Sequence, residues 1–127
     1  MNILKAAIAV LGLSTSIIAA AGDARFSAVY TETNSAESNE ILVFRRGHDG
    51  ELALVSQVAT RGRGTGAGLG NQGALMLRRD GRRLYAVNAG TNDISAFAVT
   101  PRGLAFIERV GSHGAQPISL TLHEDIL

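Results

Sequence analysis

The residues of this chain that most resemble a chemical motif lie in a glycine-rich stretch from Arg61 to Gly73. Gly68, Gly70 and Gly73 have the G-x-G-x-x-G spacing with which a backbone approaches the pyrophosphate of a dinucleotide. Such a site needs a helix directly after the glycines, because the helix N-terminus binds the phosphates. A short apolar segment and an Asp-Gly turn follow instead, a pattern typical of a strand. The stretch therefore indicates a connecting loop, and we expect no nucleotide and no other cofactor.

Three histidines are the remaining candidates for metal ligands, since the chain contains no cysteine. His48, His113 and His123 are far apart, and none has a second histidine at metal-ligand spacing. His123 and Asp125 would share one face of a strand, but one such pair does not hold a metal ion. The sequence therefore predicts no metal site.

Four arginines surround the dipeptide Asp80-Gly81 and form the main basic cluster: Arg78, Arg79, Arg82 and Arg83. A surface that binds nucleic acid needs interleaved aromatic residues or an element that fits a groove, and only Tyr85 is close by. The net charge of +1 is also too small to indicate a polyanionic partner. We expect a solvated hairpin turn here and no nucleic-acid partner.

The rest of the chain indicates short strands separated by turn residues, with no helical periodicity after the N-terminal segment. We expect the strands at residues 26–33, 40–45, 52–59, 74–77, 84–88, 94–99 and 104–110. Turns such as His48-Asp49-Gly50 separate them, since Asp and Gly tolerate the left-handed conformations of tight hairpins.

A repeat in the sequence predicts how these strands are organised. Asn39-Glu40-Ile41 and Phe44 return as Asn92-Asp93-Ile94 and Phe97. A second phrase, Leu75-x-Leu77-x-x-Asp80, returns as Leu120-x-Leu122-x-x-Asp125. A period of roughly 44 to 53 residues is typical of propeller blades or solenoid coils. A parallel β-helix has shorter coils and a sandwich does not repeat. We therefore expect an all-β fold, a β-propeller of four-stranded antiparallel blades.

The expected organisation is a partial propeller at residues 22–127 that follows a signal peptide at residues 1–21. Blade one covers about residues 26–62, blade two about 72–114, and residues 116–127 begin blade three. A single repeat cannot bury its apolar face alone. Missing blades of a larger protein, or self-association, are therefore needed to cover the exposed face of this chain.

In a propeller, the connection from the outer strand of one blade to the inner strand of the next crosses the face that carries the channel mouth. Six polar residues of these connections are candidates for binding a small anionic molecule there: Arg61, Arg63, Asn71 and Gln72 in the first connection, and His113 and Gln116 in the second. The opposite side of the channel is not in the chain, so we assign no catalytic residue.

The N-terminal segment has the pattern of a secretory signal peptide. Lys5 supplies a positive charge, residues 6–21 are uncharged, and Ala19-Ala20-Ala21 provides the small residues that signal peptidase requires. Cleavage after Ala21 is our first expectation and cleavage after Ala24 the second. The alternative is an uncleaved anchor, but an apolar run of roughly 16 residues is short for a bilayer span. We expect a periplasmic or extracellular protein that has no membrane partner once the signal is cleaved.

The segment Leu75–Asn88 resembles the signature of the lactonase-type seven-bladed β-propellers, in which each blade carries Leu-x-x-x-x-Asp-Gly-Arg-x-Leu-Tyr-Val-x-Asn. Ile94-Ser95-Ala96-Phe97 is similar to the Ile-Ser-x-Phe strand that follows in that family. The family includes bacterial 6-phosphogluconolactonases and fungal 3-carboxymuconate lactonising enzymes, and the resemblance extends over essentially the whole mature chain.

This resemblance implies hydrolysis or formation of a lactone ring on a small anionic sugar acid or a muconate. The catalytic His, Arg and Glu side chains proposed for the family come from later blades, so we expect this chain alone to be inactive. A phosphorylated sugar lactone is mainly a cytoplasmic metabolite, which argues against a 6-phosphogluconolactonase role for an exported protein. The alternative is a non-catalytic propeller that binds a ligand or another protein.

Export makes a prediction about the N-terminus of the mature protein. Expression in a bacterial host should give a secreted product that begins at Gly22, as detected by mass spectrometry of its N-terminal peptide. Ala21→Lys should block this cleavage, because signal peptidase requires a small residue at that position, whereas Asp23→Asn should leave it intact. A product that keeps residues 1–21 in the membrane fraction would instead support the uncleaved anchor.

Overall fold

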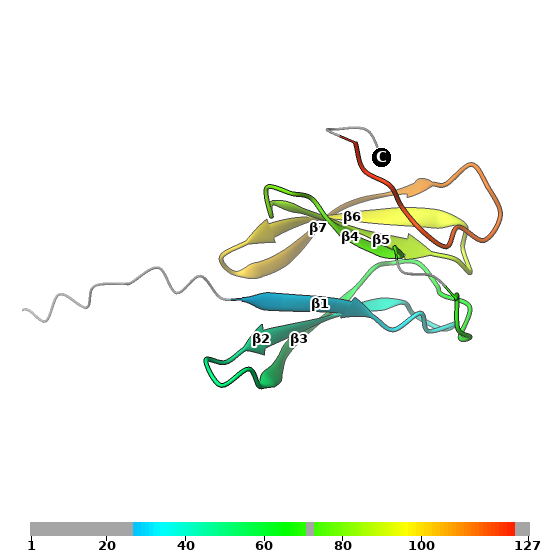
Figure 1. Ribbon diagram of the computed structural model, residues 1–127. Coiled ribbons are helices and arrows are strands. Elements are labelled where there is room, and N and C mark those ends of the chain that lie inside the picture. Colours follow the sequence, from blue (N-terminus) through cyan, green and yellow to red (C-terminus); the bar gives the residue numbers. More distant parts are fainter. Residues whose placement is uncertain (1–26, 71–72, 124–127) are drawn as a thin grey trace, which may run out of the picture.

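The computed structural model describes residues 27–70 and 73–123, which form two antiparallel sheets (Figure 1). The first sheet has the order β1-β2-β3 and consists of β1 (Ala28–Glu32), β2 (Glu40–Arg46) and β3 (Leu52–Ala59). The second has the order β4-β5-β6-β7 and consists of β4 (Leu75–Leu77), β5 (Arg83–Asn88), β6 (Asp93–Thr100) and β7 (Gly103–Gly111). Across these residues, no helix is long and apolar enough to cross a membrane.

The expected all-β fold with a four-stranded antiparallel blade is confirmed by the second sheet, in which each strand pairs with its neighbour in sequence. The first sheet has three strands among the described residues. The strands lie where the sequence predicts them, within one or two residues at each end. The first residue of the strand expected at 26–33 lies outside the described residues, as do residues 124–127 of the expected third blade.

The two sheets are structural copies of each other, as the sequence repeat predicts. Phe44 pairs with Leu54 beside a bulge in the first sheet, and Phe97 pairs with Phe106 beside a bulge in the second. Strands β1, β2 and β3 therefore correspond to β5, β6 and β7. Among the described residues, no strand lies beside β1 in the position that β4 occupies beside β5.

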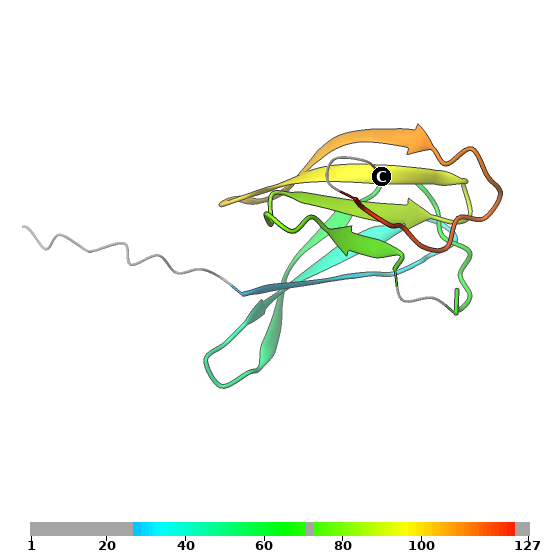
Figure 2. The ribbon, with the colours of Figure 1, turned by 45° about the horizontal axis from the view of Figure 1, so that its top comes forward.

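The sheets stack as neighbouring layers with their connections sorted to opposite ends (Figure 1). One end, here called the turn end, carries the tight hairpins at residues 47–51, 78–82 and 101–102. The other, the loop end, carries the connections at residues 33–39, 60–70 and 89–92 and the segment after β7. The β2–β3 hairpin diverges from the second sheet at the turn end (Figure 2).

The main core lies between the two sheets. Ile41 and Val43 of β2 pack with three buried residues of the second sheet, Leu84, Ala86 and Phe97. Alternate residues of a strand point to opposite faces, so these positions project from β2 and from β5 and β6 into the same layer. Phe97 has no exposed surface and meets Phe106 edge to face, with ring centres 5.7 Å apart.

The second sheet is apolar on both faces. On the side away from the first sheet, Val87 and Ala89 form a smaller buried cluster with Leu120 from the segment after β7. β5 is buried over most of its length for this reason, because it lies between two apolar layers. This is the environment of a blade between two neighbours.

Phe97 should contribute much more to stability than its repeat equivalent, Phe44. Phe97→Ala removes a fully buried ring and should lower the free energy of unfolding by about 3–5 kcal/mol. Phe44→Ala should cost about 1–2 kcal/mol, because that ring is partly exposed. Urea unfolding followed by circular dichroism checks this difference, and equal losses would contradict the assignment of the core.

Candidate functional site

Three loops of the loop end are joined by backbone hydrogen bonds into one surface. The amide of Asn39 donates to the carbonyl of Gly62 at 3.0 Å, and the amide of Gly64 donates to that of Ser35 at 2.7 Å. Gly90 donates to the carbonyl of Arg63 at 2.9 Å. The connection from β3 to β4 therefore crosses the loop end between the two sheets, as expected for a propeller.

The side chain of Asn88, at the end of β5, is fully buried below this crossing and forms four hydrogen bonds. Its Oδ1 accepts from Asn39 Nδ2 at 3.1 Å, directly before β2, and from Thr60 Oγ1 at 2.6 Å, directly after β3. Its Nδ2 donates to Asp93 Oδ1 at 2.7 Å and to Ser95 Oγ at 2.8 Å. Both polar atoms are fully used, so the amide connects the two sheets and also the ends of β5 and β6.

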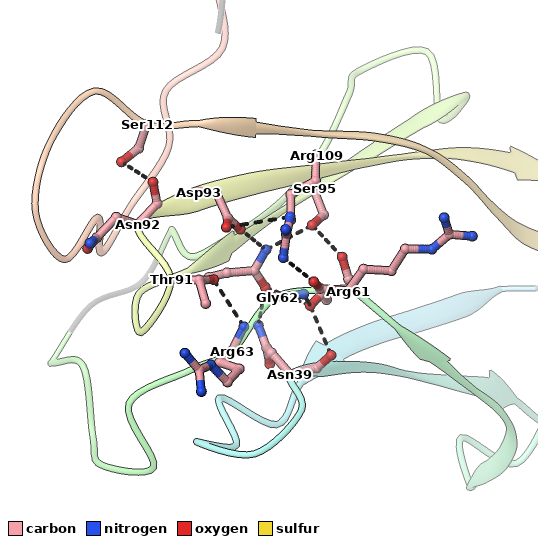
Figure 3. A network of polar contacts seen from close by, with 12 residues as sticks. Asn39, Arg61, Gly62, Arg63, Thr91, Asn92, Asp93, Ser95, Arg109 and Ser112 are labelled. Atoms are coloured by element: carbon pink, nitrogen blue, oxygen red, sulfur yellow. Dashed lines mark hydrogen bonds and ion pairs between the residues drawn. The ribbon is translucent and has the colours of Figure 1, made fainter.

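Further contacts close this network around the crossing (Figure 3). Asn39 Nδ2 donates to the carbonyl of Val87 at 3.0 Å, and Ser95 Oγ donates to that of Thr60 at 2.6 Å. Arg109 of β7 lies with its Nε 3.6 Å from Asp93 Oδ2. Its guanidinium also donates to the carbonyl of Arg61. The buried polar groups are thus paired with one another, which avoids the cost of burying them alone.

Close packing explains two glycines of the crossing, Gly62 and Gly64, and Gly90 of the neighbouring loop, whereas Gly68 and Gly70 have open space around them. A Cβ atom on Gly62 would collide with the side chain of Asn88, and one on Gly64 would collide with Asn34. A Cβ on Gly90 would collide with the carbonyl of Gly64. The element after Gly73 is the strand β4, as the sequence predicts, so the glycines do not precede a helix that could bind a pyrophosphate.

Arg61 and Arg63 are held by their backbones, and their side chains point in different directions (Figure 3). The Arg61 guanidinium lies over the ring of Phe106 at 3.8 Å from its centre, a cation–π contact on the outer strand. The amide of Arg63 donates to Thr91 Oγ1 at 3.1 Å, and its side chain is exposed. The structure therefore does not bring these two guanidinium groups together.

His113 and Gln116 lie in the corresponding segment after β7, and both side chains are exposed. Both residues have positive φ, 59° and 51°, and His113 is the repeat equivalent of Arg61, whose φ is 66°. The amide of Gln116 donates to Asn92 Oδ1 at 2.7 Å. Asn71 and Gln72, the other two candidates, lie outside the described residues.

A groove of about 800 Å³ runs along the free edge of β1 and below the crossing. Its lining includes Tyr30 and Glu32 of β1, Glu37, and residues 66–69. Burial raises the pKa of the Glu32 carboxyl to about 7, although a hydrogen bond from Asn39 acts in the opposite direction.

Within residues 27–70 and 73–123 no group of three or more His, Cys, Asp or Glu side chains is arranged to hold a metal ion.

Comparison with known families agrees with this geometry, because residues 23–126 match the family model described as lactonase, 7-bladed beta-propeller. The chain belongs to this lactonase family. The two sheets of this lactonase propeller are consistent with neighbouring blades, and the crossing is the link between them. No curated protein and no solved structure matches the chain.

Sequence reasoning missed the residues that join the blades of this lactonase propeller. Asn88 forms hydrogen bonds across the interface between the blades, and Asn39 is one of its partners. The signal was present in the repeat, because Asn39 and Asn92 begin the two copies of one phrase.

Asn88→Asp tests the joint between the blades. The carboxylate keeps the shape of the amide but cannot donate, and it places a negative charge against Asp93. We expect a loss of about 3–5 kcal/mol in the free energy of unfolding at neutral pH. The loss should decrease as the pH falls and the new carboxyl is protonated. Asn92→Asp is the matched control, since Oδ1 of the exposed residue remains an acceptor for Gln116; an equal loss there would contradict the role of Asn88.

Glu32 should make stability depend on pH. Its pKa is about 7 in the folded chain against an ordinary value of 4.5, so the folded state binds the proton more tightly than the unfolded state. The free energy of unfolding should therefore be highest below pH 4.5 and fall by about 1–2 kcal/mol as the pH rises through 7, a modest change because the carboxyl is partly open to solvent. Glu32→Gln should remove this fall, whereas Glu37→Gln in the same groove should not. Thermal unfolding of the wild type and both variants between pH 4 and 8 measures this fall in the free energy of unfolding.

Proposed function

We propose that this chain provides two blades of an exported lactonase-type propeller that hydrolyses or forms the lactone ring of a small anionic sugar acid or a muconate. The observation that carries the proposal is the family match over residues 23–126, together with two stacked antiparallel sheets. Export is supported by the signal-peptide pattern of residues 1–21.

Ring opening requires a water molecule to attack the carbonyl carbon and the ring C–O bond to break. A base in the channel takes a proton from the water, and the leaving alkoxide takes up a proton. The carbonyl oxygen gains negative charge, which nearby donors stabilise. We propose that the base comes from other blades, as the family resemblance implies, and that this chain alone does not catalyse the reaction.

Arg63 is the candidate of this chain for holding the anionic group of the substrate. Its side chain is exposed at the loop end, and no other described group forms a hydrogen bond or ion pair with its guanidinium. A guanidinium binds a carboxylate or phosphate with two parallel hydrogen bonds. Arg61 is less suited, because its guanidinium lies over Phe106.

A second candidate function is a non-catalytic propeller that binds a ligand or another protein. The observation that favours this function is that the buried polar residues of the loop end form hydrogen bonds with one another. These side chains form hydrogen bonds with one another and with backbone groups, so their donors and acceptors are already used in joining the blades: Asn39, Thr60, Asn88 and Ser95.

Lactone assays on the intact exported protein distinguish these functions. We expect hydrolysis of lactones of carboxylated sugars or of muconolactone, followed by pH-stat titration. Arg63→Ala should raise KM about 10- to 100-fold, because a charge-assisted contact is lost. Arg102→Ala, an exposed arginine in a hairpin at the turn end, is the matched control and should have no effect. Ligand binding without turnover would support the non-catalytic function, and an unchanged KM in Arg63→Ala would remove Arg63 from the site.

A further inference from the structure

We propose that the turn end of the blades binds the surface of an anionic bilayer, where its arginines contact the phosphate groups of the lipids. This surface lies at the ends of the blades and not on the faces against which other blades pack. Its position therefore does not depend on how many blades the protein has, and it plays no part in the proposed lactonase activity.

Charge is distributed unevenly over the described residues. The turn end carries seven arginines and three acidic residues in its hairpins or within two residues of them, a net charge of +4. The remaining described residues carry three arginines and five acidic residues, a net charge of −2. The seven arginines are Arg45, Arg46, Arg78, Arg79, Arg82, Arg83 and Arg102. The net charge of +1 for the whole sequence does not reveal this basic end.

Most of these guanidinium groups have no counter-ion on the described part of the chain. Five arginines of the turn end are exposed, and their guanidinium groups form no hydrogen bond or ion pair with another described group: Arg46, Arg79, Arg82, Arg83 and Arg102. Away from the turn end, Arg109 pairs with Asp93 and Arg61 lies over Phe106. Like charges without counter-ions repel one another, so an anionic partner stabilises the turn end.

The acidic residues of the hairpins serve the turns themselves. Asp80 Oδ1 accepts from the amide of Arg82 at 2.9 Å, and its Oδ2 lies 3.5 Å from Arg78 Nε. Asp49 Oδ1 accepts from the amide of Glu51 at 3.1 Å. These carboxylates hold the turns in one conformation, in which the hairpins of both sheets present arginines at the same end of the molecule (Figure 1).

The shape and composition of this end favour a bilayer over a nucleic acid. The three hairpins contain no aromatic residue on which bases could stack. The β2–β3 hairpin diverges from the second sheet, so the arginines are spread over a broad area (Figure 2). A guanidinium binds a phosphate with two parallel hydrogen bonds, and a bilayer surface offers many phosphates side by side.

The fold brings together what the sequence shows only as separate turns. Taken alone, the hairpin at Asp80-Gly81 is a solvated turn, which is what its sequence predicts. The contact proposed here is electrostatic and uses no apolar segment, so hydropathy does not indicate it. It arises because antiparallel strands return the three hairpins to one end.

Vesicle sedimentation with the intact exported protein tests the proposal. Vesicles that contain phosphatidylglycerol should bind the protein, whereas vesicles of phosphatidylcholine should not. Binding should be lost as NaCl is raised from about 0.05 to 0.5 M, because salt screens the charges.

Single substitutions locate the contact. Arg79→Ala and Arg82→Ala should each lower the partition coefficient onto phosphatidylglycerol vesicles about fivefold, because each removes one charge near the surface. Asp80→Asn should raise the coefficient by about the same factor, and the new side chain keeps the oxygen that accepts from the amide of Arg82. Arg63→Ala is the matched control, since it removes the same charge at the loop end and should leave the coefficient unchanged.

Four results would overturn the proposal. The first is equal binding to phosphatidylcholine, or no binding to phosphatidylglycerol at low salt. The second is an equal loss in Arg79→Ala and Arg63→Ala, which would report net charge and not the turn end. The third is displacement by inorganic phosphate at constant ionic strength, which would indicate a site for a free ion. The fourth is tighter binding to single-stranded DNA than to the vesicles at the same salt concentration.

Discussion

The buried amide of Asn88 is the contact on which the arrangement of the two blades depends. A buried amide must have partners for both its oxygen and its nitrogen, and here it finds them on two sheets. Apolar packing in the cluster that contains Ile41 and Phe97 also holds the sheets together, but it is not directional. The four hydrogen bonds of Asn88 are directional and fix the relative position of the two blades, because all four form together at one position only.

The close approach of the loops follows from this joint. Thr60 begins the crossing and is itself a partner of Asn88, so the chain after it must pass directly over the buried amide. A side chain does not fit at Gly62 for that reason, and one at Gly64 would collide with Asn34. Close packing accounts for Gly62 and Gly64 and not for the motif-like glycines Gly68 and Gly70, around which a Cβ atom would meet no atom within 4 Å. Arg63 takes part in the joint through its backbone, and its side chain is exposed.

Much of the fold could be predicted because it depends on local patterns. Alternating apolar residues and Asp-Gly turns specify strands such as β5 and β6 within a residue or two. The repeat of Asn39-Glu40-Ile41 as Asn92-Asp93-Ile94 indicates equal blades. The candidate site was harder to predict, because it depends on which way each side chain turns. Arg61 and Arg63 are two residues apart in sequence, yet one guanidinium lies on Phe106 and the other is exposed.

The sequence by itself determined the class of fold, the positions of the strands and the membership of a repeating family, because periodicity and turn chemistry act over a few residues. Only the tertiary structure decided the partners of Asn88 and the reason for Gly62 and Gly64. Those features depend on residues 28 to 49 positions apart in the chain, such as Thr60 and Asn88 or Asn39 and Asn88, that meet only when one blade packs on the next. A pattern within a single strand therefore cannot predict contacts between residues so far apart in the sequence.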